Sequence, residues 1–165
     1  MSESVILRGD PSERVADAYE SIWHTRMQDL PFLNPNLRVE AVGFRPWEGQ
    51  WLGALVTPWS LNLLLLPGGE GQWTSLAPGS ERFVTFPAGR FRFIAGLEAG
   101  LGESHSCSLF SPVLEFTDHE AARLTAAAAL GALFEAEALA DRPGPVSKRD
   151  FLRGRVSGAP HGDRG

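Results

Sequence analysis

One apolar stretch, residues 48–67, constrains the fold of this chain more than any other part of the sequence. It holds the densest apolar run, two of the five tryptophans and two prolines. Residues 51–56 predict a strand buried on at least one face. Pro58 then interrupts the strand, because a proline cannot donate to a sheet ladder. Leucines occupy both faces of residues 61–66, so we expect this strand at the centre of an antiparallel sheet, covered on both sides.

Four further strands are predicted over residues 39–44, 83–86, 90–95 and 104–109, with turn signals every 8 to 12 residues or so. Residues 10–13 and 117–120 resemble capping boxes, which predict helices over residues 11–29 and 118–133. We expect Phe32 and Leu33 to pin the loop after the first helix to the core. In the second helix, small residues such as Ala127, Ala128 and Gly131 should allow close packing on the sheet.

These elements predict an α+β fold: an antiparallel β-meander sheet flanked by an N-terminal and a C-terminal helix, with a flexible basic C-terminal tail. We expect a single domain over residues 10–140, between a flexible N-terminus (1–9) and the tail (141–165). Residues 1–140 carry 9 Lys and Arg against 17 Asp and Glu, and residues 141–165 carry 6 against 3. An acidic body argues against nucleic acid as a partner, because phosphates require clustered positive charge.

The cellular compartment is indicated by what the sequence lacks. The single cysteine excludes an internal disulfide and suits a reducing compartment. No signal peptide is visible at the N-terminus, and no window is long and apolar enough to span a bilayer. We therefore expect a cytoplasmic protein with no stable membrane insertion.

The residues suited to catalysis or metal binding are few, with no nucleophile elbow, phosphate-binding glycine loop or paired-cysteine site. His105 and Cys107 share one face of a predicted strand, and His119 follows, so a metal or activated-thiolate site is one interpretation. The alternative, which we favour, places His105 and Cys107 against the core. We predict no cofactor and no enzymatic activity.

Tryptophans near turns and strand ends are candidates for partner binding, since tryptophan is enriched at recognition surfaces. The candidates are Trp47, Trp51, Trp59 and Trp73, with Leu63 flanking Trp59. In the alternative interpretation these tryptophans belong to the core, which we expect for at least two of them. An apolar sheet beside an acidic surface suits the capture of a basic, apolar peptide.

Several motifs resemble those of the HybE/HupJ-type assembly chaperones of [NiFe]-hydrogenases, over about residues 15–157. They are residues 29–35, 48–51, 57–59, 66–68, 106–109, 111–112 and 149–155, of which Gly-Gln-Trp followed by Thr-Pro-Trp is the most specific. The resemblance implies a chaperone that binds the hydrogenase small-subunit precursor, with its twin-arginine signal peptide, and the large subunit before export. It also implies links to a separate rubredoxin-like protein and to oxygen protection, and it supplies no catalytic residues.

The tail contains a second motif. Residues 147–153, Ser-Lys-Arg-Asp-Phe-Leu-Arg, resemble the twin-arginine export motif Ser-Arg-Arg-x-Phe-Leu-Lys, with no long apolar run after it. One interpretation is a solvated basic tail. The other is an imitation of the client's signal peptide that contacts the acidic, apolar body through Lys148, Arg149, Phe151, Leu152 and Arg153.

Overall fold

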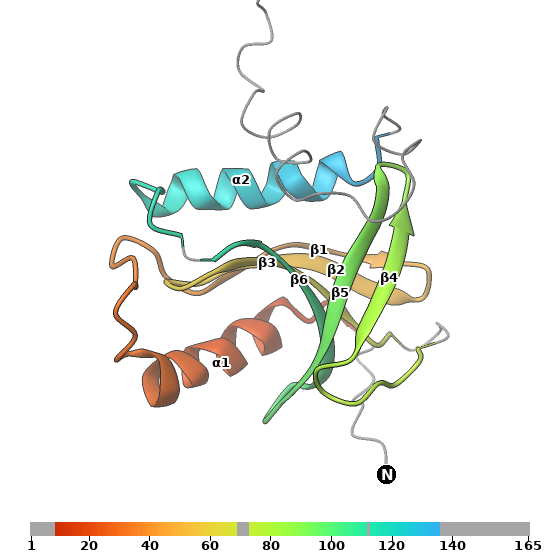
Figure 1. Ribbon diagram of the computed structural model, residues 1–165, viewed down its shortest axis with the longest axis horizontal. Helices are drawn as coiled ribbons and strands as arrows, with labels where there is room; N and C mark the ends of the chain where they lie inside the picture. Colours follow the sequence, from red (N-terminus) through yellow and green to blue (C-terminus); the bar gives the residue numbers. More distant parts are fainter. Residues whose placement is uncertain (1–8, 69–72, 112, 136–165) are drawn as a thin grey trace, which may run out of the picture.

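The computed structural model describes residues 9–68, 73–111 and 113–135, and it forms three layers with one sheet between two helices (Figure 1). The elements in order are α1 (Ser12–Ile22), the π-helix η1 (Trp23–Met27), β1 (Glu40–Trp47), β2 (Gln50–Val56), β3 (Leu61–Leu66), β4 (Glu81–Phe86), β5 (Gly89–Glu98), β6 (Gly102–Phe110) and α2 (His119–Ala132). Within these ranges, no helix is long and apolar enough to cross a membrane.

The sheet has six antiparallel strands in the order β1-β2-β3-β6-β5-β4. It consists of two three-stranded meanders that meet where β3 pairs with β6. Helix α2 covers one face of the β1–β2–β3 half and α1 covers the other (Figure 1). The predicted α+β class is therefore confirmed. The predicted basic tail lies outside the described residues.

Strand β3 has the two buried faces that its sequence predicts. Leu63 and Leu65 belong to the core cluster beneath α2, whereas Leu64 and Leu66 belong to the cluster beneath α1. All four leucines are completely buried. The predicted break before β3 is also confirmed, because Thr57 donates its N–H to the Ser60 carbonyl in a turn between β2 and β3.

Helix α2 begins where the sequence predicts, but its cap is Asp118 rather than the predicted box of Thr117 and Glu120, and it packs through a different face than we expected. The Asp118 carboxylate accepts a hydrogen bond of 2.8 Å from the Ala121 N–H. The expectation that Ala127, Ala128 and Gly131 face the sheet is wrong, because all three are exposed. The residues that pack on the sheet are Ala122, Ala126, Ala129, Leu130 and Leu133. Alanine occupies both faces of this helix, so the apolar period does not identify the buried one.

Helix α1 begins at Ser12 without the predicted capping box. The Asp10 carboxylate accepts hydrogen bonds from the N–H and hydroxyl of Ser12, and Pro11 occupies the cap position with no side-chain bond. Val15 and Ala18 form the buried stripe of the helix. The helical course continues to Met27 as η1, close to the predicted end.

Strand β1 is longer than the sequence predicts. Pro46 and Trp47, which lie beyond the predicted strand end at residue 44, pair with Trp51 and Gln50 of β2. Because β1 is an edge strand, Pro46 can lie in it without removing a bond to a second neighbour. The turn contains only Glu48 and Gly49, both at positive φ.

Gly68, two residues after β3, lies close against the backbone of Gly49 in the β1–β2 turn, and a substitution there tests this close approach. A Cβ atom built there would lie 2.2 Å from the Gly49 carbonyl oxygen, so backbone would have to move. We expect Gly68→Ala to lower the free energy of unfolding by about 1–3 kcal/mol, as measured by urea denaturation. Gly96→Ala is the control, because a Cβ atom there would have no neighbour within 4 Å. Equal stability of the two variants would contradict the packing at Gly68.

Candidate functional site

Asn34 joins three segments that lie far apart in the sequence at one end of the sheet. Its backbone N–H donates to the Pro58 carbonyl at 2.8 Å. Its side-chain amide donates to the carbonyls of Val113 and Phe116, each at 2.9 Å. Asn34 is 3% exposed, so these bonds are shielded from water. The loop after η1, the β2–β3 turn and the segment before α2 are therefore held together by one side chain and its backbone.

Two tryptophans stack at this end of the molecule. The rings of Trp23, in η1, and Trp59, in the β2–β3 turn, have centroids 5.9 Å apart and planes inclined by 23°. The turn is fixed by the Thr57 hydroxyl, which accepts hydrogen bonds from the N–H groups of Trp59 and Ser60. Both tryptophans are half-buried.

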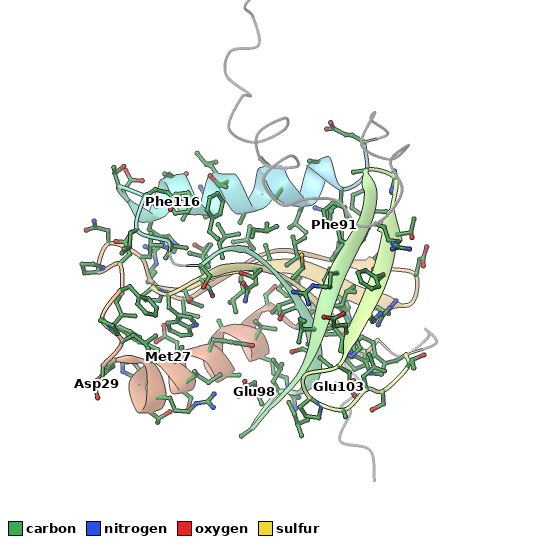
Figure 2. All side chains as sticks on the ribbon, viewed as in Figure 1. Met27, Asp29, Phe91, Glu98, Glu103 and Phe116 are labelled. Atoms are coloured by element: carbon green, nitrogen blue, oxygen red, sulfur yellow. The ribbon has the colours of Figure 1, made fainter. Side chains whose placement is uncertain are left out.

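Phe32 lies two residues before Asn34 and is 40% exposed, so the expectation that it pins its loop to the core is wrong. Asn34 makes that attachment through hydrogen bonds instead. We call Trp23, Phe32 and Trp59 together the loop-end surface. Met27 and Asp29 mark this end of the molecule in Figure 2, opposite Glu103. Single π-helical turns such as η1 are frequent at functional sites.

An open groove of about 680 Å³ runs between α1 and the β5–β6 turn. It is lined by Glu13, Arg14, Asp17, Ala18, Ser21, Ala99 and Gly100. The Arg14 guanidinium donates to the Gly100 carbonyl at 3.1 Å, and Arg26 forms an ion pair with Glu98 at 2.8 Å. Arg14 and Arg26 are thus engaged, whereas Glu13 and Asp17 face the groove.

The four candidate tryptophans do not form one surface. Trp47 packs against Phe86 and Trp73 stacks on His105, both on the α2 side of the sheet. Trp51 packs on the α1 side. Only Trp59 lies at the loop end. Leu63 is completely buried, so its predicted place beside Trp59 on a partner-facing surface is wrong.

A polar cluster of the buried Glu103 and His105 with the half-buried Arg82 lies at the opposite end of the sheet. An Arg82 nitrogen lies 2.9 Å from His105 Nδ1, and a guanidinium can only donate, so Nδ1 accepts. The proton is therefore on Nε2, which donates to Glu103 Oε2 at 2.7 Å. His105 is neutral in this arrangement, and Arg82 supplies the cation that balances Glu103.

This cluster holds the segment before β4 against the sheet. Glu103 accepts hydrogen bonds from the Ser75 hydroxyl at 2.6 Å and from the Leu76 N–H at 2.7 Å. Trp73 stacks on His105, with ring centroids 4.2 Å apart. Burial lowers the pKa of His105; the Glu103 hydrogen bond opposes this effect and the Arg82 charge adds to it. Burial also lowers the pKa of Arg82.

The two histidines that we considered as metal ligands have separate partners. His119 Nε2 lies 2.7 Å from a Glu40 oxygen, and its Nδ1 accepts from the Arg38 N–H. His105 belongs to the polar cluster, and Cys107 is buried opposite Leu63. Across residues 9–68, 73–111 and 113–135, no three His, Cys, Asp or Glu side chains gather as a metal site.

The sequence analysis did not identify Trp23 and Phe32 as residues of the loop-end surface. Phe32 was expected to contact the core. Trp23 is the one tryptophan outside residues 47–73, and its place at the end of a predicted helix gave no signal of exposure. Its pairing with Trp59 depends on the fold. The predicted tail contacts Lys148, Arg149, Phe151, Leu152 and Arg153 lie outside the described residues.

Comparison with known proteins gives consistent matches. The family model "[NiFe]-hydrogenase assembly, chaperone, HybE" matches residues 10–154. The hydrogenase expression/formation protein HupJ of Bradyrhizobium diazoefficiens is 41% identical over 87% of each chain. The probable rubredoxin HupJ of Rhodobacter capsulatus is 40% identical over 76% of this chain, but the match spans 45% of that longer protein.

A solved structure supports the same grouping. The solution structure of HybE from Escherichia coli superposes with a TM-score of 0.64 and 28% sequence identity. The match covers 91% of this chain and 88% of that chain. The likeness thus includes the sheet and both helices.

The polar cluster predicts a pH dependence of stability. Because the folded-state pKa of His105 is lowered, the unfolded chain binds a proton near the ordinary value of about 6.5 that the folded chain does not. Stability should therefore be fully present above that pH and fall as the pH drops through it. We expect a smaller free energy of unfolding at about pH 5.5 than at about pH 7.5. In His105→Gln this difference should shrink.

Proton NMR of the His105 ring reads the same property without a variant. The ring signals should keep the neutral position below the ordinary pKa of histidine. Ring signals that titrate at the ordinary value would contradict the arrangement.

The environment of Cys107 predicts slow chemistry at its thiol. Its side chain is 5% exposed in the core between the sheet and α2. We expect alkylation by iodoacetamide to be slow in the folded protein and fast in denaturant, because the reagent must reach the thiolate. Fast labelling of the folded protein, followed by mass spectrometry, would contradict the buried position.

Proposed function

Because the chain belongs to the HybE family of [NiFe]-hydrogenase assembly chaperones, we propose that it binds the precursor subunits of such a hydrogenase before their export. The proposed clients are the small subunit, through its twin-arginine signal peptide, and the large subunit. The proposed compartment is the cytoplasm. The proposed action is to hold and shield the client without catalysis.

The loop-end surface is the single observation that carries this proposal to particular residues. Trp23 and Trp59 stack with half-buried rings, and the loop that Asn34 attaches to the Trp59 turn carries the exposed Phe32. Tryptophan binds apolar partners well because it offers a large rigid area with little conformational entropy to lose. The surface is also held in shape before binding, since Asn34 and Thr57 fix its loops.

A signal peptide matches this side of the molecule in chemistry. It carries basic residues followed by an apolar run. The apolar run suits the loop-end surface, and the basic residues suit the neighbouring groove lined by Glu13 and Asp17. Electrostatic complementarity of this kind chiefly raises the association rate and the specificity.

Protection of the client from oxygen is a further part of the proposal. This chain has one cysteine, so it lacks the paired cysteines of a rubredoxin. The Rhodobacter capsulatus relative that is called a probable rubredoxin is longer than this chain's match to it. We propose that a separate rubredoxin-like protein would act beside this chain.

Trp59→Ala tests the proposed surface. We expect the variant to bind a twin-arginine signal peptide about 30-fold more weakly, which corresponds to the roughly 2 kcal/mol typical of an aromatic hot-spot residue. Isothermal titration calorimetry with the synthetic peptide gives the dissociation constant. Urea denaturation of the same variant gives its stability.

Trp47→Ala is the matched control, because Trp47 is also half-buried but packs against Phe86, and Trp59 does not. It should lower stability while leaving peptide affinity unchanged. Equal loss of affinity in the two variants, or loss that follows stability in both, would argue against a loop-end binding surface.

A further inference from the structure

Residues 147–153 of this chain have the chemistry that the loop-end side of the molecule should bind. They contain three cations and one carboxylate around an adjacent pair of apolar residues, Phe151 and Leu152. The family match ends at residue 154, so this segment belongs to the matched part of the chain. The segment lies outside the described residues.

The loop-end side of the molecule offers aromatic rings for the apolar residues of the segment and carboxylates for its cations. Trp23, Phe32 and Trp59 provide an aromatic area at the end of α1 and η1. Along α1, Glu13 and Asp17 line the groove, while Arg14 and Arg26 are held by Gly100 and Glu98. Among the described residues that line this groove, a basic segment therefore meets the carboxylates of Glu13 and Asp17, while Arg14 is already bonded to Gly100.

The overall charge favours the same contact. Residues 1–140 carry 9 basic against 17 acidic side chains, whereas residues 141–165 carry 6 against 3. Opposite net charges on two parts of one chain attract over roughly a Debye length, about 8–10 Å near physiological salt. The effect should weaken as salt is added.

The chain is long enough for residues 147–153 to reach the loop end. The last described residue is Glu135, which follows α2. Helix α2 has 14 residues, a length of about 21 Å at 1.5 Å per residue. The residues between 135 and 147 can extend about 40 Å at roughly 3.3 Å each. This reach exceeds the length of α2, which runs along the sheet (Figure 1).

We propose that residues 147–153 occupy the loop-end surface of their own chain, with Phe151 and Leu152 on the tryptophans and the cations toward Glu13 and Asp17. A client's signal peptide would then have to displace them, a consequence that rests on the function proposed above. An attached segment has an effective concentration of about 1 mM. If its own dissociation constant is about 0.1 mM, it weakens the apparent affinity of a competing peptide on the order of 10-fold.

The contact itself is tested in the full chain without any client. Arg149→Glu combined with Phe151→Ala removes one cation and one apolar group from the segment. Arg155→Glu combined with Val156→Ala is the matched control, because it makes similar changes just beyond the segment. Nitrogen-15 NMR of the tryptophan indole N–H groups reads the surface directly.

We expect the first variant to shift the indole signals of Trp23 and Trp59 but not that of Trp47, and the control to shift none of the three. A synthetic peptide of residues 145–156, added to the first variant, should return the two signals toward their original positions. Unchanged Trp23 and Trp59 signals in the first variant, or equal shifts in the control, would overturn the contact.

Competition is tested by the affinity of a synthetic peptide with Ser-Arg-Arg-x-Phe-Leu-Lys followed by an apolar run. The first variant should bind this peptide on the order of 10-fold more tightly than the intact chain, with a smaller gain at high salt. Equal affinity would overturn the competition. If the indole signals move but the peptide binds neither protein, the contact stands and the proposed function fails. If the peptide binds both proteins equally and the indole signals do not move, the proposed function stands and the intramolecular contact is overturned.

Discussion

Burial of both faces of β3 is the constraint on which the rest of the structure depends. Leu61, Leu63 and Leu65 point into the core beneath α2, and Leu64 and Leu66 point into the core beneath α1. Each buried leucine contributes about 1.5–3 kcal/mol when it leaves water, so neither face can remain open. In this chain a helix on each side supplies the cover, α2 over one face and α1 over the other. The three layers follow from these five side chains.

The same constraint locates the surfaces that are available to a partner. With both faces of the β1–β2–β3 half covered by helices, the loops at the ends of the strands are what remains. At one end Asn34 gathers three loops through its own hydrogen bonds, and Phe32 in the first of them remains exposed. Connecting loops on a rigid scaffold are a common location for binding residues. Here the scaffold fixes the loops and the loops carry the aromatic rings.

The sequence predicts those parts of the fold in which local pattern and tertiary environment agree. Residues 61–66 match β3, since leucines on both faces have one structural solution. Helix α2 was located but its buried face was not, because alanine at half of its positions, on both faces, removes the contrast between faces. The extension of β1 through Pro46 depends on its edge position, which is a property of the sheet. The pairing of Trp23 with Trp59 is similar, since 36 positions separate them and only the fold brings them together.

At one end of the sheet the polar side chains are buried and hydrogen-bonded within the chain, whereas at the other end an aromatic side chain is exposed to solvent. Glu103 and His105 are buried, and their bonds to Arg82, Ser75 and Leu76 all lie within the chain. A buried ion pair that loses one partner leaves the other charge uncompensated, so this cluster resists rearrangement by a ligand. A partner can cover the exposed Phe32 ring without breaking any bond within the chain, and removing its apolar surface from water lowers the free energy of the complex. This physical asymmetry supports the proposal that the loop end is the recognition surface, whereas the polar cluster stabilises the fold.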